Sequence, residues 1–365
     1  MKKILFASVD IGWRISNYTS FLQKRFGSKL LIRSFVKRRV PRQLYKTRYD
    51  YTFRFHTYPA IVQWLISFLM FLYFLLRFNT FYFFSGESIL TRKTRKLEFW
   101  VYRLFGKKII MHFVGSDIRD PQYLYWKDKN MLDFLQNNPQ MKKTADWQDK
   151  LISDSTKFAD HILVSTPDLL EIVPSAKYYP VMIDANKFLS ELNGADPSKK
   201  PLFKTKKIKI LHAPSNIDLK GSAMVAEVIK KLAKADDRIE FIYTKDLNRD
   251  TGLVYTVSRY ELFQLYREAD IVIDQMVIGW YGLQSVEALL AGCQTICYIE
   301  ENLKHYLFPD CPIICSNILE LESSVKKAVD VAMAGEVNTR KQRDWVRKYH
   351  SIEQNHKVLV DAIEN

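Results

Sequence analysis

The sequence predicts an α/β protein built from parallel sheets. Short runs rich in β-branched and aromatic residues alternate with segments whose apolar residues recur at helical spacing, which is typical of βα units. The chain has 365 residues, which is longer than a domain with a single hydrophobic core usually is. Of these residues 47% are hydrophobic, which is too high a share for a disordered chain. We therefore expect two domains. The expected strands lie in KILFASV, TFYFF, KKIIMHFV, HILVST, KIKILHA, IEFIYT, DIVIDQ, QTICYI and PIICS.

One change in composition marks the expected domain boundary. Residues 190–207, SELNGADPSKKPLFKTKK, are rich in Gly, Pro, Ser and Lys, and the run KIKILHA follows directly. We expect a first domain over residues 1–190 and a second over residues 207–335. Residues 336–365 have the spacing of one or two polar amphipathic helices.

Basic residues are concentrated in the first half of the chain. The whole sequence carries 55 Lys and Arg against 40 Asp and Glu, a net charge of +15. Residues 1–200 hold 33 basic and 17 acidic side chains, whereas residues 201–365 hold 22 and 23. The first half is therefore expected to face an anionic partner, such as a membrane surface or a nucleic acid.

The four cysteines predict neither a disulfide framework nor a metal site. They occur as Cys293-x3-Cys297 and Cys311-x3-Cys315 in a chain much longer than small disulfide-stabilised domains. Zinc knuckles favour C-x2-C pairs on tight turns. We expect buried thiols in a reducing compartment and no bound metal.

The segment 60–76, AIVQWLISFLMFLYFLL, is the main membrane candidate. Gln63 and Ser67 interrupt it, Arg77 ends it, and its 17 residues are at the lower limit for a span. Three interpretations of this segment remain open. It is a helix that spans a membrane, a helix of the protein core, or a helix whose apolar face lies on a membrane. Flanking basic residues favour the third, because they attract an anionic leaflet. These are Arg33, Lys37, Arg38, Arg39, Arg42, Lys46 and Arg48 before the segment, and Arg92, Lys93, Arg95 and Lys96 after it.

The first candidate site follows the strand ADIVID. Gly279 and Gly282 bracket two aromatic residues, a helix is expected from Leu283, and Glu287 lies one turn inside it. A glycine turn opening onto a helix offers backbone N–H groups to a phosphate, and a carboxylate one turn further can bind ribose hydroxyls. A helix with an ordinary surface glutamate would show the same pattern.

The second candidate site follows the strand KIKILHA. Ser215 and Asn216 lie in the loop, and Lys220 and Gly221 stand where the next helix begins. A lysine beside a helix N-terminus suits a diphosphate. A helix merely capped by Asn216 or Asp218 would look alike.

The third candidate site is KKIIMHFVGSDIRD. His112 lies near the end of the expected strand, Gly115 and Asp117 follow it, and Arg119 comes just after. Histidine can carry protons at neutral pH, so His112 is a catalytic candidate, although a core histidine would fit equally well.

Taken together, the three segments resemble those of GT-B glycosyltransferases, most closely the family-4 group of retaining enzymes that use sugar nucleotides. The resemblance covers nearly the whole chain, through HFVGSDIR, ADHILVSTPDLLEIVPSAKYYP, HAPSNIDLKGS, ADIVIDQMVIGWYGLQSVEALLAGCQTICYI and RKYHSIE. It implies two Rossmann-like domains facing a cleft, with the donor nucleotide on the second domain. It also implies that the C-terminal helices, residues 336–365, pack back on the first.

Carried over by residue, the family pattern matches this sequence in part. The family has E-G-F-G-L-P-x-L-E where this sequence has G-W-Y-G-L-Q-S-V-E, so Glu287 matches the second glutamate and Gly279 replaces the first. The resemblance assigns the ribose hydroxyls to Glu287 and the diphosphate to Lys220, whose usual arginine partner cannot be placed. The implied donor-binding set is Ser215, Asn216, Lys220, Gly221, Tyr281, Gly282, Leu283, Gln284 and Glu287.

The first domain also departs from the family pattern. Val114 stands where the common H-G-S-D motif has its histidine, and His112 lies two residues earlier, on the same face of a strand. We expect His112 to take the place of the missing imidazole. The implied catalytic set is His112, Asp117 and Lys220, with Gly12 and Trp13 on the acceptor side.

The resemblance implies sugar transfer from a nucleoside-diphosphate sugar to an acceptor hydroxyl, with retention at the anomeric carbon. No Asp-x-Asp motif occurs, so we expect no metal and no other cofactor. The basic first domain and segment 60–76 favour a lipid-linked or saccharide acceptor. They also favour a cytoplasmic protein held peripherally on the inner face of the cytoplasmic membrane.

Three other functions remain open. A nucleic-acid-modifying glycosyltransferase would also need a basic domain, but duplex DNA offers no partner for the apolar segment 60–76, so nucleic acid is not the expected partner. The replacements at Gly279 and Val114 are compatible with a degenerate, non-catalytic subunit. A nucleotide-sugar epimerase of the same fold is the third.

Overall fold

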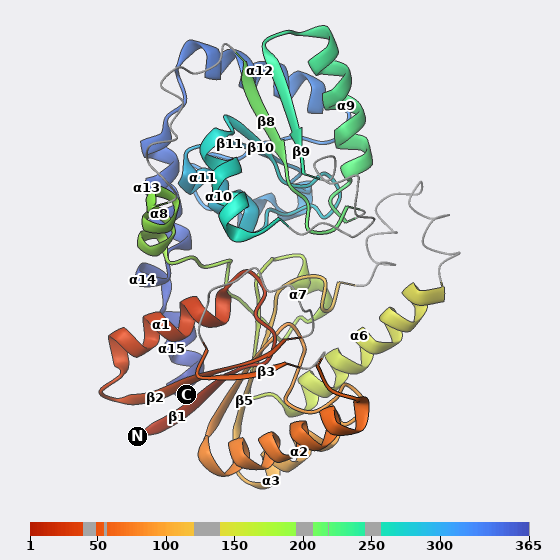
Figure 1. Cartoon of the computed structure of the whole chain (residues 1–365), viewed down its shortest axis with the longest axis vertical. Helices are drawn as coiled ribbons and strands as arrows, with labels where there is room; N and C mark the ends of the chain where they lie inside the picture. Colours follow the sequence, from red (N-terminus) through yellow and green to blue (C-terminus); the bar gives the residue numbers. More distant parts are fainter. Residues whose placement is uncertain are drawn as a thin grey trace. The chain divides into compact units, whose positions relative to one another are not determined.

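The computed structural model describes residues 1–38, 49–54, 57–119, 139–194, 207–217, 219–244 and 257–364. It consists of two compact units, each an α/β structure with one parallel sheet (Figure 1). Unit 1 comprises Met1–Pro180 and His356–Asn365, and unit 2 comprises Val181–Asn355. The predicted α/β fold with two parallel sheets is confirmed, and all nine expected strands are present.

Unit 1 contains a seven-stranded sheet in the order β3-β2-β1-β4-β5-β6-β7. Neighbouring strands are all parallel, and the order reverses between β1 and β4. Ligands of doubly wound sheets bind at such a reversal, beyond the carboxyl ends of the strands. The strands are β1 (Lys2–Ala7), β2 (Leu30–Arg38), β3 (Tyr51–Arg54), β4 (Thr80–Phe84), β5 (Lys108–Phe113), β6 (His161–Val164) and β7 (Lys177–Tyr178).

Helices cover both faces of this sheet, which explains why strands such as TFYFF are apolar throughout. Figure 1 shows α1 and α15 on one face and α2, α3 and α6 on the other. Aromatic rings fill the second face, where Phe81 stacks on Tyr102 with centroids 4.1 Å apart. The helices are α1 (Arg14–Phe26), α2 (Ala60–Arg77), α3 (Arg95–Leu104), α6 (Pro139–Phe158), α7 (Leu169–Ile172) and α15 (Lys357–Glu364).

Unit 2 contains a five-stranded parallel sheet in the order β12-β11-β10-β8-β9, which reverses between β8 and β10. Its strands are β8 (Ile208–His212), β9 (Ile239–Tyr243), β10 (Ile271–Ile273), β11 (Gln294–Cys297) and β12 (Ile314–Cys315). Its helices are α8 (Ala185–Gly194), α9 (Ser222–Ala235), α10 (Arg259–Glu268), α11 (Leu283–Ala291), η5 (Glu301–Tyr306), α12 (Leu321–Ala334), α13 (Thr339–His350) and α14 (Ile352–Asn355).

The division into units differs from the expected domain boundaries at two places. Helix α8, expected partly in the first domain, belongs to unit 2, where the Phe188 ring lies 5.1 Å from that of Phe263. Helix α13, expected to pack on the first domain, contributes the buried Trp345 and Val346 to the core of unit 2. Of the C-terminal residues, only His356–Asn365 belong to unit 1. The core of each unit is completed by apolar side chains that are distant from one another in the sequence. A local change in composition therefore could not locate the boundaries between the units.

Candidate functional site

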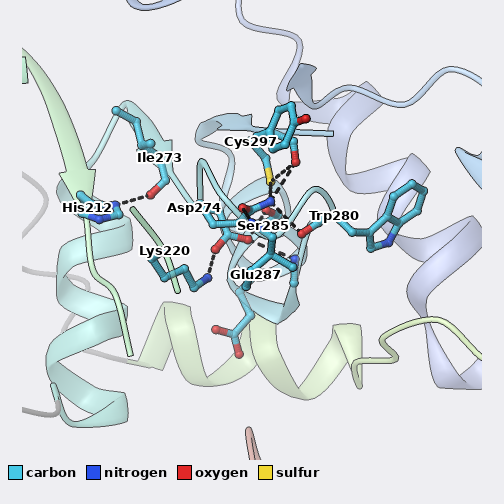
Figure 2. Close-up of polar contacts among 12 residues, drawn as sticks. His212, Lys220, Ile273, Asp274, Trp280, Ser285, Glu287 and Cys297 are labelled. Carbon is cyan, nitrogen blue, oxygen red and sulfur yellow. Dashed lines mark hydrogen bonds and ion pairs between the residues drawn. The ribbon is translucent and has the colours of Figure 1, made fainter. Parts of the chain in front are cut away.

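The strand reversal of unit 2 holds a buried ion pair. Lys220, from the loop after β8, places its Nζ against Oδ1 of Asp274, which directly follows β10 (Figure 2). Oδ2 of Asp274 accepts hydrogen bonds from the Gly282 N–H (3.1 Å) and the Ser285 hydroxyl (2.6 Å). The Asp274 side chain is fully buried, and that of Lys220 is 13% exposed. This carboxylate therefore ties Lys220 to the N-terminus of α11.

The charge of Asp274 depends on this pairing. Burial by itself raises the pKa of Asp274, but the Lys220 ammonium and the hydrogen bonds from Ser285 and Gly282 outweigh it. The resulting pKa lies below the ordinary value for aspartate, so the carboxylate is ionised at neutral pH. Asp274 is not among the residues predicted from the sequence, although its place at the end of the strand ADIVID was a usable signal.

A glycine allows Lys220 to reach this position. Gly221 precedes α9 with a φ of 66°, a conformation that favours glycine. A Cβ atom there would lie 2.9 Å from Cγ2 of Val277. The Met276 N–H also donates to the Lys220 carbonyl (3.2 Å), which joins the two loops. The loops after β8 and β10 are therefore held close together.

The N-terminus of α11 offers hydrogen-bond donors next to this pair. As the first amides of a helix, the N–H groups of Leu283 and Gln284 have no carbonyl partner within it. The side-chain Nε2 of Gln284 is also buried and has no hydrogen-bond partner among the residues that the structure describes. A lysine ammonium, helix amides and a free amide donor together suit a phosphate group.

Glu287 belongs to a second, separate set of contacts in unit 2. It is 3% exposed and accepts a hydrogen bond from the Tyr266 hydroxyl (3.2 Å). Nη1 of Arg259 lies 3.4 Å from Oε1 of Glu287, and Nε of Arg259 binds Glu191 (2.9 Å). Burial raises the pKa of Glu287, and Arg259 opposes this shift. In Figure 2 the Glu287 side chain extends away from the pair of Lys220 and Asp274. Its role in ribose binding stays a prediction.

Gly279 lies directly against another carboxylate. Its φ is 83°, and a Cβ atom at this position would be 3.0 Å from both Cβ and Oε2 of Glu300. The Glu300 N–H donates to the Gly279 carbonyl (2.9 Å). Glu300 therefore brings a carboxylate to the place where the sequence pattern loses one. Its only sequence signal was its position just after the strand QTICYI.

The remaining predicted donor-binding residues are divided between the surface and the core. Ser215 and Asn216 are exposed, and Oδ1 of Asn216 accepts from the Leu219 N–H (3.0 Å). Tyr281 is 1% exposed and its hydroxyl lies 3.2 Å from Nε2 of His350. The structure therefore places the Tyr281 side chain in the core of unit 2, where it packs against Trp280. A direct contact with the donor through this ring does not fit the observed burial.

In unit 1, His112 belongs to a buried polar network. Its ring is fully buried, with Nδ1 2.8 Å from the Tyr82 hydroxyl and Nε2 2.9 Å from the Ser165 hydroxyl. Arg14 also donates to Ser165 (2.7 Å). Burial lowers the pKa of His112 well below its usual value, so the ring is neutral. Both ring nitrogens already have hydrogen-bond partners, so this geometry does not fit a direct contact between His112 and a substrate. The spacing of two residues between His112 and Val114 predicts that both lie on the same face of a strand. It does not predict that the His112 side chain is fully buried.

Asp117 holds the loop after β5. It is 4% exposed, and its carboxylate accepts from the N–H groups of Val114 (3.0 Å) and Gly115 (2.7 Å). Gly115 has a φ of 138°, and a Cβ atom there would lie 2.9 Å from Nη1 of Arg119. The observed contacts of Asp117 are those of a residue that shapes the loop.

Gly12 and Trp13 lie at the carboxyl end of β1, at the strand reversal of unit 1. Both have left-handed backbone conformations, with φ of 64° and 58°. Asp10, which is not among the residues predicted from the sequence, accepts hydrogen bonds from the Ile15 N–H (3.0 Å) and the Tyr49 hydroxyl (2.8 Å). These contacts fix the turn into α1.

The described residues contain no group of three or more His, Cys, Asp or Glu side chains arranged to hold a metal ion. The four cysteines are free thiols, of which Cys293 and Cys297 are buried.

Comparison with known proteins shows the fold. No protein-family model matches the chain, and no curated protein matches it by sequence. Among solved structures, the chain is similar to Anabaena HepE in complex with UDP-glucose, with a TM-score of 0.67, 12% identity, and coverage of 100% of this chain and 99% of that one. It is also similar to a sucrose-phosphate synthase from Thermosynechococcus elongatus, with a TM-score of 0.64, 11% identity, and coverage of 100% and 98%.

A third similar structure has a different activity. It is the UDP-GlcNAc 2-epimerase from Methanocaldococcus jannaschii, with a TM-score of 0.55, 12% identity, and coverage of 100% and 99%. These likenesses extend over the full chain, and they show that it has the GT-B architecture, with two Rossmann-like units.

Proposed function

We propose that this protein is a glycosyltransferase that takes its sugar from a nucleoside diphosphate. The observation that carries the proposal is the Lys220–Asp274 pair at the strand reversal of unit 2, next to the N-terminus of α11. GT-B structures that are similar over the full chain support it, since HepE binds UDP and UDP-glucose. UDP sugars are therefore the first donors to test.

In the proposed reaction, Lys220 and α11 stabilise the leaving group. The bond between the anomeric carbon and the diphosphate breaks, and the diphosphate keeps the electron pair. A new bond forms from the acceptor hydroxyl oxygen to the anomeric carbon, and the hydroxyl proton passes to an oxygen of the departing diphosphate. The Lys220 ammonium and the amides of Leu283 and Gln284 face the charge that develops on the diphosphate. Asp274 acts as a positioning residue, because it fixes the Lys220 side chain beside those amides.

We further propose that Glu300 supplies the carboxylate that the sequence pattern lacks at Gly279. Its Oε2 lies 3.0 Å from the position a Cβ atom would take at residue 279. Glu300→Gln keeps the size of the side chain and removes its charge. Turnover of the variant should fall about tenfold or more with nucleoside-diphosphate affinity unchanged, if the carboxylate acts on the sugar. Equal losses of UDP and UDP-sugar affinity would instead indicate a structural role.

The acceptor and the stereochemical outcome follow from the family resemblance and the charge distribution. We propose retention at the anomeric carbon and an acceptor that is a lipid-linked or cell-surface polysaccharide precursor. The protein would meet it at the inner face of the cytoplasmic membrane, because the basic half of the chain suits an anionic surface. We also propose that no metal is needed, so turnover should survive EDTA. Loss on chelation with recovery on adding Mn²⁺ or Mg²⁺ would contradict this.

The second candidate function is nucleotide-sugar epimerisation, because UDP-GlcNAc 2-epimerases share the fold. Nuclear magnetic resonance of UDP sugars mixed with the protein separates the two. Hydrolysis of the donor, or transfer to an added acceptor, supports a transferase, whereas acceptor-free interconversion of sugar epimers supports an epimerase. No reaction of any bound donor would favour a non-catalytic subunit.

A thermal-shift panel tests the proposal as a whole. Ligands that bind only the native state raise the melting temperature by mass action. UDP or a UDP sugar should raise it, and Lys220→Ala should reduce the shift. A panel in which no nucleoside diphosphate or nucleotide sugar stabilises the protein would contradict the proposed function.

A further inference from the structure

Helix α2 exposes most of its apolar side chains. It is the one helix among the described residues with the length and composition to cross a membrane. Of its 18 residues, only Ser67, Phe71, Phe74 and Leu75 are buried. Its exposed residues recur every three or four positions and form one stripe. They are Ile61, Trp64, Leu65, Leu69, Leu72, Tyr73 and Leu76.

Helix α3 extends this apolar stripe. The rings of Phe71 on α2 and Tyr102 on α3 lie 5.4 Å apart, and both helices cover the same face of the sheet (Figure 1). Leu104 is 65% exposed. We refer to the two stripes together as the α2–α3 face. Beside those of α2, it includes Leu97, Trp100 and Leu104 of α3 and Phe105, which directly follows α3.

The segment that forms the α2–α3 face is rich in basic residues. Residues 51–113 contain nine Lys and Arg but only two acids, Glu87 and Glu98, and both acids are buried. Arg92 pairs with Glu87 and Arg103 pairs with the exposed Asp160. An apolar surface with an excess of basic side chains complements an anionic bilayer, which attracts such charges and accepts the apolar side chains. The exposed basic residues of this region are Arg54, Arg77, Arg92, Lys93, Lys96 and Arg103.

The structure changes which basic residues can contribute to a membrane surface. Lys37 is 4% exposed and donates to the carbonyls of Ser88 and Leu90 (both 2.8 Å). Arg95 is 1% exposed and pairs with Asp154. Both side chains therefore make contacts inside unit 1 and are not part of its surface. Arg39, Arg42, Lys46 and Arg48 lie outside the described residues, as does the side chain of Arg38.

Helix α2 is held flat against the sheet. It connects β3 to β4, two parallel strands of the same sheet. Phe74 packs on Phe35 of β2 with ring centroids 5.1 Å apart. A spanning orientation would pull α2 off the sheet to which both β3 and β4 belong and remove Phe74 from the core. The exposed stripe therefore suits contact along a membrane surface.

We propose that the α2–α3 face is a docking surface for an anionic lipid bilayer. Trp64 and Trp100 are exposed on it, and tryptophan favours the boundary between headgroups and acyl chains. The proposal deepens the proposed function, since it rests on that function for the idea of a membrane-bound acceptor. Binding to vesicles requires no sugar transfer and can be measured separately.

Vesicle flotation tests this surface. The full chain is mixed with phosphatidylcholine vesicles, or with vesicles containing about one third phosphatidylglycerol. The protein should float with the anionic vesicles and be released by high salt. Leu69→Glu with Leu104→Glu should weaken binding at least about tenfold. The matched control is Leu319→Glu, because Leu319 is 91% exposed but lies in unit 2.

A second pair of variants tests the charges. Lys93→Glu with Lys96→Glu should weaken binding to anionic vesicles about tenfold or more, since about 1 kcal/mol is associated with each such charge. Lys234→Glu with Lys327→Glu, exposed lysines of unit 2, should have little effect. Quenching by lipids with brominated acyl chains adds a direct readout. It should decrease in Trp64→Phe and Trp100→Phe if these side chains enter the bilayer.

Several outcomes would overturn the proposal. These are no flotation with either vesicle type, equal binding to both, or unchanged binding by the Leu69 and Leu104 double variant. Light scattering that shows a dimer which dissociates in that double variant would assign the face to a second copy of the chain. Circular dichroism establishes that each variant is folded. A retained thermal shift with UDP sugars separates failure of docking from failure of the proposed function.

Discussion

Units 1 and 2 place polar residues at the ends of their strands in different ways. In unit 1, the two nitrogens of His112 and the carboxylate of Asp117 are occupied by contacts within the unit. In unit 2, Lys220 is partly exposed and stands beside helix amides that have no carbonyl partner in α11. The same architecture therefore supports buried contacts around His112 and Asp117 in one unit and a site with helix amide donors in the other.

The units also differ in charge and in surface. The basic excess lies in the half of the chain that contains the α2–α3 face, whereas residues 201–365 are nearly neutral. We therefore expect unit 1 to provide a surface for a large anionic partner and unit 2 to bind a small anion. The following predictions test this contrast, beginning with the largest expected effect.

Removing Lys220 should have the largest effect. Lys220→Met leaves Asp274 buried without its cation, which should lower the free energy of unfolding by about 3–5 kcal/mol. Turnover should fall about a hundredfold to a thousandfold, because the departing diphosphate loses its cation. Urea unfolding and initial rates measure the two effects. The double variant Lys220→Met with Asp274→Asn should recover much of the stability without the turnover, and normal turnover in it would contradict the role of the ammonium.

Glu287→Gln should weaken nucleotide binding by about 1.5–3 kcal/mol, the range for hydrogen bonds to a charged group. Glu191→Gln is the matched control, because Glu191 pairs with the same arginine but is more exposed. Because burial raises the pKa of Glu287, it gains a proton at a higher pH than an ordinary glutamate. Calorimetry should therefore show wild-type affinity falling on acidification from neutral pH, and a weaker dependence in Glu287→Gln. Identical pH profiles would exclude this carboxylate.

His112→Gln should lower the free energy of unfolding by about 1–3 kcal/mol, because Tyr82 and Ser165 lose a buried partner. The ring is neutral in the folded state, while the unfolded chain binds a proton near the ordinary value of 6.5. Stability should therefore fall as the pH drops below about 6.5, and the slope should be smaller in the variant. Equal slopes in urea unfolding at several pH values would count against a buried neutral ring.

Gly279→Ala should have the smallest effect, about 1–2 kcal/mol from placing a side chain at positive φ. Gly335→Ala is a matched control, because it has a φ of 71° and no atom within 4 Å of an added Cβ atom. Any additional loss in Gly279→Ala reports the contact with Glu300. That excess should fall when Glu300→Ala, which removes the contact with Oε2, is combined with it, and should disappear with Glu300→Gly, which also removes the Cβ atom of residue 300. A persistent excess would mean that Glu300 is not the group in contact.

Local sequence patterns predicted the strands better than they predicted the contacts at the site. Alternation of apolar runs is a short-range signal, so β8 and β10 were found. The ion pair of Lys220 and Asp274 joins residues 54 positions apart and depends on the strand order, which the sequence does not state locally. The contact of Glu300 with Gly279 and the pairing of Arg259 with Glu287 have the same origin.

Burial was the other property that local patterns could not supply. His112 and Lys37 are polar residues near strand ends, yet both are enclosed by side chains and loops from distant segments. The exposed apolar residues of α3 were not predicted, because the sequence does not state locally that α3 packs beside α2. Its apolar residues became informative only beside those of α2.

Calorimetric titration of UDP tests most directly whether unit 2 carries the nucleotide site. Wild-type protein should bind UDP with one site per chain. The double variant Lys220→Met with Asp274→Asn, which removes both charges of the pair, should bind at least about tenfold more weakly, because charged hydrogen bonds of this kind contribute about 1.5–3 kcal/mol. A folded double variant with wild-type UDP affinity, or a wild-type protein that binds no UDP or other nucleoside diphosphate, would contradict this account.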